Sequence, residues 1–367
     1  MLRIGLSGGP ASGKSTSLSM IEKLLTERFG KKVFIVPETA TELIVNGIAP
    51  GGPIGMDEFQ EIVIEKQLAK EELYLRVAEK YYNSDDVVIL YDRTVLDLLA
   101  YTSREYFDKL LQSRGYTMAD MINRYDAIIH LVTSAKGTDC YTTENNAARR
   151  ETAEEAIVMD EKTLAANIVH PHLRVIDNST NFEEKIQRVA NVIFEMLGVP
   201  SPSEIEKKYL IKRPSQEILE GLDYVSKNEI VQTYLASNDP NVERRIRQRG
   251  TPSHGYSFYY TEKIPVSSVE RIEKERRISM DEYIGYLEEA DTNLHQVRKT
   301  RYCFIYENQY FELDVYPYSK EYAIVEIELP NSTSEVVLPP FLNVIKEVTD
   351  DERYKNHSIA NSLVITE

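Results

Sequence analysis

A glycine-rich stretch near the start of the chain carries the residue types that bind a phosphate chain. It fits the pattern G-x-x-x-x-G-K-[ST] with the residues Gly8, Gly9, Pro10, Ala11, Ser12, Gly13, Lys14, Ser15 and Thr16. Glycines allow backbone N–H groups to turn toward a phosphate, and the N-terminus of a following helix adds its dipole. The sequence therefore predicts that this stretch binds ATP or GTP, with Lys14 at the β- and γ-phosphates and Ser15 on Mg²⁺.

Other polar residues of the first half follow short apolar runs. Asp92 comes after the run at 87–91 and is predicted to hold Mg²⁺, unless it only caps the next helix. Glu38 comes after the run at 33–36 and is a candidate catalytic group that positions a hydroxyl or water nucleophile; the alternative is an exposed loop glutamate. Arg149 and Arg150 are predicted to close over bound phosphates, unless they only begin a solvated charged helix.

Charged residues at alternate positions recur in the second half. If residues 203–212 form a strand, Glu204, Glu206 and Lys208 lie on one of its faces. That face is either the solvated side of an edge strand or the lining of a lumen, and the period does not distinguish the two. A lumen would need a divalent metal for its carboxylates and a polyanion for its cations, because buried charges must be paired. The same spacing recurs in Arg245 and Arg247, Lys299 and Arg301, Glu312 and Asp314, and Glu326 and Glu328.

The elements that would position these residues differ between the two halves. In the first, apolar runs at 2–6, 33–36, 87–91, 127–132 and 173–176 alternate with helical patterns, which predicts a doubly wound α/β domain. A Gly/Pro/Ser cluster at 198–203 indicates a linker. We therefore predict two domains, 1–199 and 200–367. The second is an α+β domain whose antiparallel strands close into a barrel, with a helical segment at 280–293 that interrupts the strands along the chain.

Composition limits the classes of function. The chain has 367 residues and a net charge of −16, which argues against general nucleic-acid binding. It has no apolar run long enough for a transmembrane segment. With only two cysteines and a first segment typical of a strand and not of a signal peptide, the sequence predicts a cytoplasmic protein.

The first half resembles the nucleoside- and nucleotide-kinase branch of the P-loop NTPases. The resemblance rests on the GGPASGKST stretch, on VPET after the second apolar run and on YDRT after the third. The chain has no Asn-Lys-x-Asp signature, so the choice between ATP and GTP stays open. No set of residues that would select an acceptor substrate is evident.

The second half resembles the CYTH, or triphosphate tunnel metalloenzyme, superfamily. The resemblance begins at Glu204-x-Glu206-x-Lys208 and continues in the family's order to residues 347–349. It implies one or two Mg²⁺ or Mn²⁺ ions held by Glu204, Glu206, Asp314, Glu326 and Glu328. It also implies a triphosphate held by Lys208, Arg245, Arg247, Lys263, Lys299 and Arg301, with Glu204, Glu206 and Lys208 in the catalytic centre. Thiamine triphosphate is disfavoured as a substrate, because this chain has no tryptophan to stack on its base.

Three functions remain open at this stage. The first is a metal-dependent triphosphatase acting on inorganic triphosphate or a nucleoside triphosphate. The second is an ATP- or GTP-gated binding or trafficking protein, whose tunnel docks a phosphoinositide or polyphosphate with little turnover; the joined architecture is similar to that of the TRPL translocation-defect group. The third is a nucleoside or nucleotide kinase with a regulatory tunnel domain.

Overall fold

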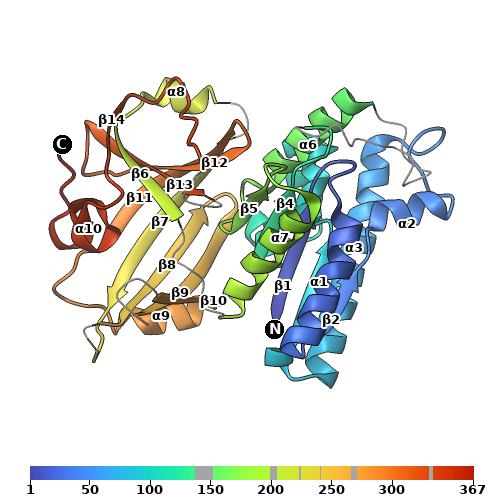
Figure 1. Cartoon of the computed structure of the whole chain (residues 1–367), viewed down its shortest axis with the longest axis horizontal. Coiled ribbons are helices and arrows are strands. Elements are labelled where there is room, and N and C mark those ends of the chain that lie inside the picture. The colour runs from blue at the N-terminus through green and yellow to red at the C-terminus, as the bar shows by residue number, and fades with distance from the viewer. Residues whose placement is uncertain (137–151, 199–204, 223–224, 240, 266–270, 330–333) are drawn as a thin grey trace. The chain divides into compact units, whose positions relative to one another are not determined.

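The computed structural model describes residues 1–136, 152–198, 205–222, 225–239, 241–265, 271–329 and 334–367. Contacts between residues divide the chain into two compact units, Met1–Ile193 and Phe194–Glu367. Each unit has its own sheet (Figure 1). Most of the linker predicted at 198–203 lies outside the described residues.

The first unit is built on a five-stranded sheet of order β2-β3-β1-β4-β5, in which every pair of neighbouring strands is parallel. Its strands are short and apolar, and β3 and β4 are buried along their whole length, as expected of a parallel sheet covered on both faces. This agrees with the α/β domain predicted for the first half. The strands are β1 (Leu2–Ser7), β2 (Lys32–Val36), β3 (Val87–Asp92), β4 (Ala127–Leu131) and β5 (Leu173–Ile176).

Helices flank this sheet, and α1 and α3 both pack against β2 and β3. Residues 95–113 form two helical elements and not one helix, because Thr94 caps a 3₁₀ turn and Ser103 caps a separate helix. None of the helices in the described part of the chain has the length and apolar character that a membrane crossing requires. The elements are α1 (Lys14–Phe29), α2 (Thr39–Val45), α3 (Met56–Tyr81), η1 (Ser84–Asp86), η2 (Val95–Ala100), α4 (Arg104–Ser113), α5 (Met118–Ile122), α6 (Ala153–Asn167) and α7 (Phe182–Met196).

The second unit is built on a nine-stranded sheet of order β10-β9-β8-β7-β11-β12-β13-β6-β14, with antiparallel pairing throughout. Among the described residues no pairing joins its edge strands β10 and β14, so closure into a barrel stays a prediction. Its strands are β6 (Ile205–Lys212), β7 (Ser226–Leu235), β8 (Glu243–Thr251), β9 (Gly255–Pro265), β10 (Arg271–Ile278), β11 (Val297–Tyr306), β12 (Gln309–Val315), β13 (Tyr322–Leu329) and β14 (Val344–Glu347).

Short helices accompany this sheet. The helix expected at 280–293 is shorter than predicted, because α9 (Met280–Leu287) ends where Glu288 takes the C-cap position. The other helices are α8 (Gln216–Glu220), η3 (Glu352–Tyr354) and α10 (Asn356–Ser362).

The two faces of the second sheet differ in character. One face packs an apolar core that includes Tyr209, Phe311, Leu313 and Ile327. The opposite face, called the charged face below, carries Glu206 and Lys208 (β6), Arg245, Arg247 and Arg249 (β8), Lys263 (β9), Glu273 and Glu275 (β10), Lys299 and Arg301 (β11), Glu312 and Asp314 (β12), and Glu326 and Glu328 (β13).

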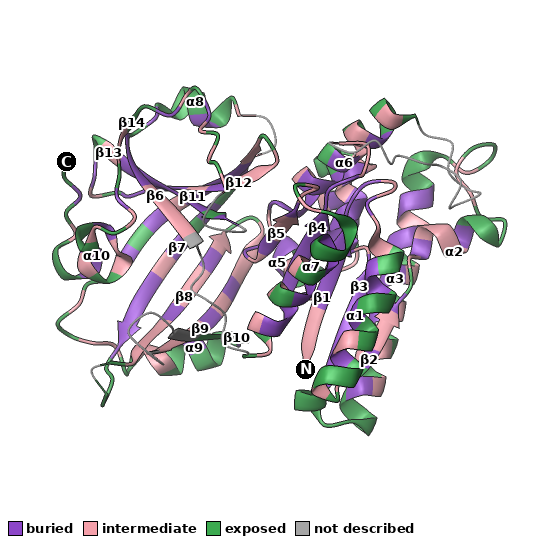
Figure 2. Ribbon diagram, in the orientation of Figure 1, coloured by how far each residue is buried: buried purple, intermediate pink, exposed green. Residues whose placement is uncertain are grey.

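Much of the charged face is not solvated. Lys299, Arg301, Asp314 and Glu326 are buried, and consecutive positions of β13 are buried as well (Figure 2). These residues therefore do not form a solvated outer face of the sheet. Because charged groups are rarely buried without partners, their burial indicates that they are paired.

Candidate functional site

The glycine-rich stretch joins the end of β1 to the start of α1. Gly13 stands at the N-cap of α1 with φ 90°, a left-handed conformation that favours glycine. It offers no side-chain acceptor to the helix, and the first turn of α1 contains no acidic residue. The first N–H groups of α1 are therefore left for an outside acceptor, which is the arrangement of an anion site at a helix N-terminus.

Lys14 is folded back into the loop that precedes it. Its Nζ donates to the carbonyl oxygens of Gly8 at 2.7 Å and Gly9 at 3.0 Å, and to the Ser12 hydroxyl at 3.1 Å. Burial, followed by the charge of Arg93, lowers the pKa of Lys14 to about 8. A bound phosphate would supply the negative charge that this buried ammonium lacks.

Asp92 ends β3 on the same edge of the sheet. Its Oδ1 is buried and has no hydrogen-bond partner within the described part of the chain. Burial raises the pKa of Asp92, and the charge of Lys14 opposes that shift. An unpaired carboxylate oxygen beside a phosphate loop fits a Mg²⁺ ligand, since Mg²⁺ prefers oxygen donors.

Glu38 is held by a residue that the sequence prediction did not use. Arg93 has the unusual backbone φ of 73°, and its Nε donates to Glu38 Oε1 at 2.5 Å. Burial raises the pKa of Glu38, but the charges of Arg93 and Lys14 outweigh it and lower the pKa to about 2. In this arrangement Glu38 is a weak proton acceptor.

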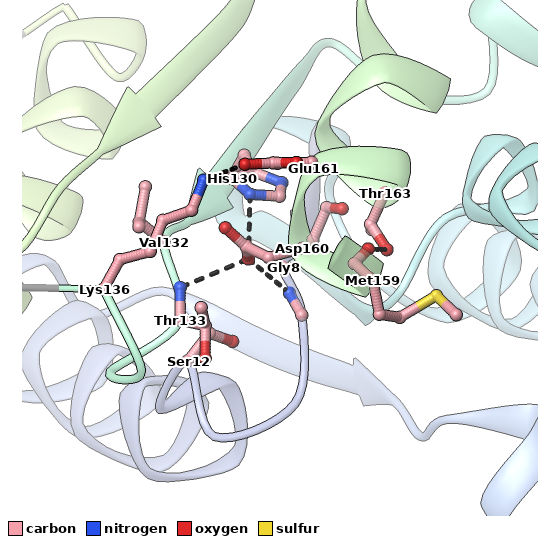
Figure 3. Close-up of polar contacts among 12 residues, drawn as sticks. Gly8, Ser12, His130, Val132, Thr133, Lys136, Met159, Asp160, Glu161 and Thr163 are labelled. Atoms are coloured by element: carbon pink, nitrogen blue, oxygen red, sulfur yellow. Dashed lines mark hydrogen bonds and ion pairs between the residues drawn. The ribbon is translucent and has the colours of Figure 1, made fainter. Parts of the chain in front are cut away.

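Asp160, a buried carboxylate of α6, accepts hydrogen bonds from the backbone of the phosphate loop (Figure 3). Asp160 Oδ1 accepts from the Gly9 N–H at 2.8 Å and the Thr133 N–H at 3.2 Å, and lies 3.2 Å from His130 Nε2. Asp160, His130 and Thr133 are each 0% exposed. Burial raises the pKa of Asp160, but His130 and the Gly9 N–H reverse this, and the net pKa is lowered. Asp160 therefore fixes the position of Gly9 as an ionised group.

The two glycines that flank α1 give a matched test of the loop. A Cβ at Gly13 would lie 2.8 Å from the Phe182 ring, whereas a Cβ at Gly30 (φ 63°) would meet nothing within 4 Å. Both substitutions to alanine carry the strain of a left-handed residue, about 1–2 kcal/mol. We expect Gly13→Ala to weaken ATP or GTP binding at least about tenfold, because it also displaces the helix N-terminus. Calorimetric titration of both variants checks this, and equal affinities would contradict it.

On the charged face, Lys208 joins two predicted metal ligands. Its Nζ lies 2.7 Å from Glu326 Oε1 and 3.1 Å from Glu206 Oε1. Burial raises the pKa of Glu206, and the charge of Glu326 adds to the rise. For Glu326 burial acts in the same direction, but Lys208 and Arg301 outweigh it and lower the pKa. Of these two carboxylates, Glu206 is thus the one with less compensating positive charge.

Arg301 connects Glu326 to the carboxylates of β12. Its guanidinium donates to Asp314 Oδ1 at 2.7 Å and Oδ2 at 2.6 Å, to Glu326 Oε2 at 3.0 Å, and also to Glu312. Lys299 Nζ donates to Asp314 Oδ2 at 2.5 Å. A continuous chain of alternating charges therefore crosses β6, β13, β12 and β11.

A second cluster lies on β8, β9 and β10. Arg245 and Lys263 both contact Glu273, at 3.2 and 2.7 Å, and Arg247 contacts Glu275 at 3.1 Å. The predicted basic residues of the tunnel therefore belong to two groups, each paired with its own carboxylates.

The predicted site residues have different outcomes. Glu204, Arg149 and Arg150 lie outside the described residues. Glu328 stands opposite Glu206 in the pairing of β13 with β6. Within the described ranges, no three acidic, histidine or cysteine side chains converge as a ready-made metal site. The residues that sequence reasoning did not assign to a site are Arg93, His130, Asp160, Phe182, Arg249, Glu273, Glu275 and Glu312; for the last four the alternating charge pattern was the available signal.

The comparisons with known proteins address the two parts separately. A family model described as an AAA domain matches residues 3–185. The N-terminal part is accordingly an AAA-type domain of the nucleotide-binding kind, which agrees with its parallel sheet and phosphate loop.

An inorganic triphosphatase of Nitrosomonas europaea is 30% identical over 165 residues, which are 44% of this chain and 99% of that protein. The chain belongs to the family of this triphosphatase. The relative accounts for less than half of the chain, so the joining of the two parts stays a prediction.

Solved structures give similar coverage. The crystal structure of an inorganic triphosphatase is 28% identical, covers 44% of this chain and 95% of that one, and has a TM-score of 0.32. The structure of a protein from Pyrococcus horikoshii is 22% identical, covers 35% of this chain and 80% of that one, and has a TM-score of 0.26.

Proposed function

We propose that the chain is a metal-dependent triphosphatase whose second unit is a triphosphate tunnel domain, with inorganic triphosphate or a nucleoside triphosphate as substrate. The observation that carries this proposal is the burial of basic groups on the charged face, where Lys299 and Arg301 are each 5% exposed. Membership of the triphosphatase family supports it. The AAA-type domain binds ATP or GTP through Gly8–Thr16 in this proposal.

The carboxylates of the charged face fit a divalent metal by their chemistry. Glu206, Glu326 and Glu328 are oxygen donors on neighbouring strands, and oxygen is the donor that Mg²⁺ and Mn²⁺ prefer. Lys208 now neutralises two of them, and Glu206 retains a raised pKa that nearby positive charge would lower. A bound metal would polarise the phosphoryl oxygens of the substrate.

The chain's own cations would hold the substrate. Arginine forks bind phosphate through paired hydrogen bonds, and lysines act as point charges. Arg301, Lys299 and Lys208 face the same side of the sheet as the carboxylates, so they would stabilise charge that develops on a phosphoryl group there. When substrate binds, its phosphate oxygens would replace the carboxylates that now pair with these cations.

A second function is favoured by one observation. Glu326 and Asp314 are ion-paired with Lys208 and Arg301. Among the described residues, no three acidic, histidine or cysteine side chains converge as a metal site. Docking of an anion requires the cations but no metal. A nucleotide-gated binding protein that holds polyphosphate or a phosphoinositide headgroup therefore remains the alternative, and a kinase with a regulatory tunnel stands beside it.

Neighbouring lysines of β6 provide the test. Lys208 lies on the charged face and Lys207 on the opposite one, where it contacts Glu347 at 3.5 Å. We expect Lys208→Met to reduce phosphate release from tripolyphosphate by about 100-fold or more, because a half-buried donor to the substrate is lost. Lys207→Met should change the rate less than about twofold. The measurement is phosphate release with Mg²⁺ or Mn²⁺ from tripolyphosphate, ATP and GTP.

Two further variants assign the activity to one unit. Loss of phosphate release with Glu206→Gln alone places hydrolysis on the charged face, whereas loss with Lys14→Ala alone places it in the phosphate loop. Binding of tripolyphosphate without release of phosphate by the wild type would overturn the triphosphatase and support the binding protein.

A further inference from the structure

One buried arginine of the charged face has no carboxylate partner among the residues that the structure describes. Arg249 is 4% exposed and follows Arg245 and Arg247 at alternate positions of β8. Within the described part of the chain its hydrogen bonding is confined to Cys303, from Nη2 to Sγ at 3.6 Å. Arg245 and Arg247 are instead paired with Glu273 and Glu275.

Two of the groups beside Arg249, the Cys303 thiol and the Tyr310 hydroxyl, are neutral. Cys303 is fully buried, and burial raises the pKa of its thiol, so it supplies no negative charge. The Tyr310 hydroxyl oxygen is also buried and has no nitrogen or oxygen partner among the described residues. Burial raises the pKa of Tyr310 too. Arg249 and Tyr310 therefore bring two donors to one place with no conventional acceptor between them.

The carboxylate whose charge acts on Arg249, Glu312, is already ion-paired with another residue. Glu312 influences both Arg249 and Tyr310, but it is ion-paired with Arg301. A buried charge without its own counter-charge is unfavourable, and it persists where a ligand completes it. An anion would complete the Arg249 position.

We propose that Arg249, with the Tyr310 hydroxyl and the Cys303 thiol beside it, forms an additional anion subsite for a linear polyphosphate of four or more phosphoryl groups. Successive arginines of β8 stand about 7 Å apart, so Arg249 extends the basic row beyond Arg247. A guanidinium is suited to this ligand because its fork matches two phosphate oxygens. The proposal rests on the proposed function, because it assigns the first three phosphoryl groups to the other cations of the charged face.

The test compares two chain lengths. Calorimetric titration of the full chain with tripolyphosphate and tetrapolyphosphate, without divalent metal to prevent turnover, gives the ratio of the two affinities. We expect Arg249→Met to lower the preference for tetrapolyphosphate by at least about tenfold. Arg249→Lys should lower it less, because it keeps the charge. Arg244→Met is the matched control on the opposite face of β8 and should leave the ratio unchanged.

A second measurement needs no ligand. Arg249→Met should raise the unfolding temperature of the unliganded protein, because an apolar chain replaces a buried charge that lacks a counter-charge. A structural arginine would give the opposite shift. An unchanged affinity ratio, with both ligands bound by the wild type, overturns this inference and leaves the proposed function standing. A wild type that binds neither ligand without metal, and releases no phosphate from tripolyphosphate with Mg²⁺ or Mn²⁺, overturns both. If Arg249→Met does not fold, the ratio measured for Arg249→Lys decides.

Discussion

Replacing Arg301 with alanine is expected to destabilise the second unit by about 3–5 kcal/mol, because it leaves buried carboxylates without their counter-charge. The side chain of Arg301 is 7% exposed and that of Asp314 is 0% exposed, so water cannot replace the lost guanidinium without opening the sheet. Hydrogen exchange of the backbone amides of β11 and β12 measures the change in the free energy of opening. A loss below about 1 kcal/mol would show that the network contributes little.

The same strand supplies the control for this prediction. Arg298 lies on the opposite face of β11, is exposed, and donates to Gln296 at 3.0 Å. We expect Arg298→Ala to change the free energy of opening by less than about 0.5 kcal/mol. Comparable losses in the two arginine variants would mean that any truncation in β11 destabilises the sheet, and that the buried network has no special role.

The strand, glycine-rich loop and helix at residues 2–29 could be predicted because the information for them is local. Gly13 and Lys14 are neighbours in the chain, and the strand and helix on either side are evident from their residue patterns. The contact by which Asp160 fixes this loop could not be predicted in the same way. Asp160 accepts from the N–H of Gly9 across 151 positions of sequence, and no spacing rule reports such a contact.

The charged face shows the same division between local and distant information. Period 2 predicts that Glu206 and Lys208 share one face, and the pairing of β6 with β13 places Glu326 on that face beside Lys208. The register of that pairing depends on contacts between strands far apart in the chain. For this reason the sequence did not indicate that Lys208 would join Glu206 to Glu326, or that Arg249 would reach a thiol on β11.

Replacing Asp160 with alanine is expected to have the largest effect in the first unit. Two buried N–H groups, of Gly9 and Thr133, would lose an ionised acceptor, and each such loss costs about 1.5–3 kcal/mol. We therefore expect a destabilisation of about 3–5 kcal/mol, with ATP or GTP affinity reduced at least about tenfold because Gly9 is no longer fixed. Hydrogen exchange at β1 and α1 and calorimetric titration measure the two effects.

Glu161 is the matched control, because it is the next residue of α6 and its side chain is 56% exposed. Glu161→Gln should change stability by less than about 0.5 kcal/mol. The pH dependence separates a charged support from mere packing. Since folding lowers the pKa of Asp160, its contribution is present above the ordinary carboxylate pKa and is lost as the pH falls through the folded value. Asp160→Asn should therefore be less stable than the wild type at neutral pH and approach it in acid, whereas a constant difference across that range would show that Asp160 acts by shape alone.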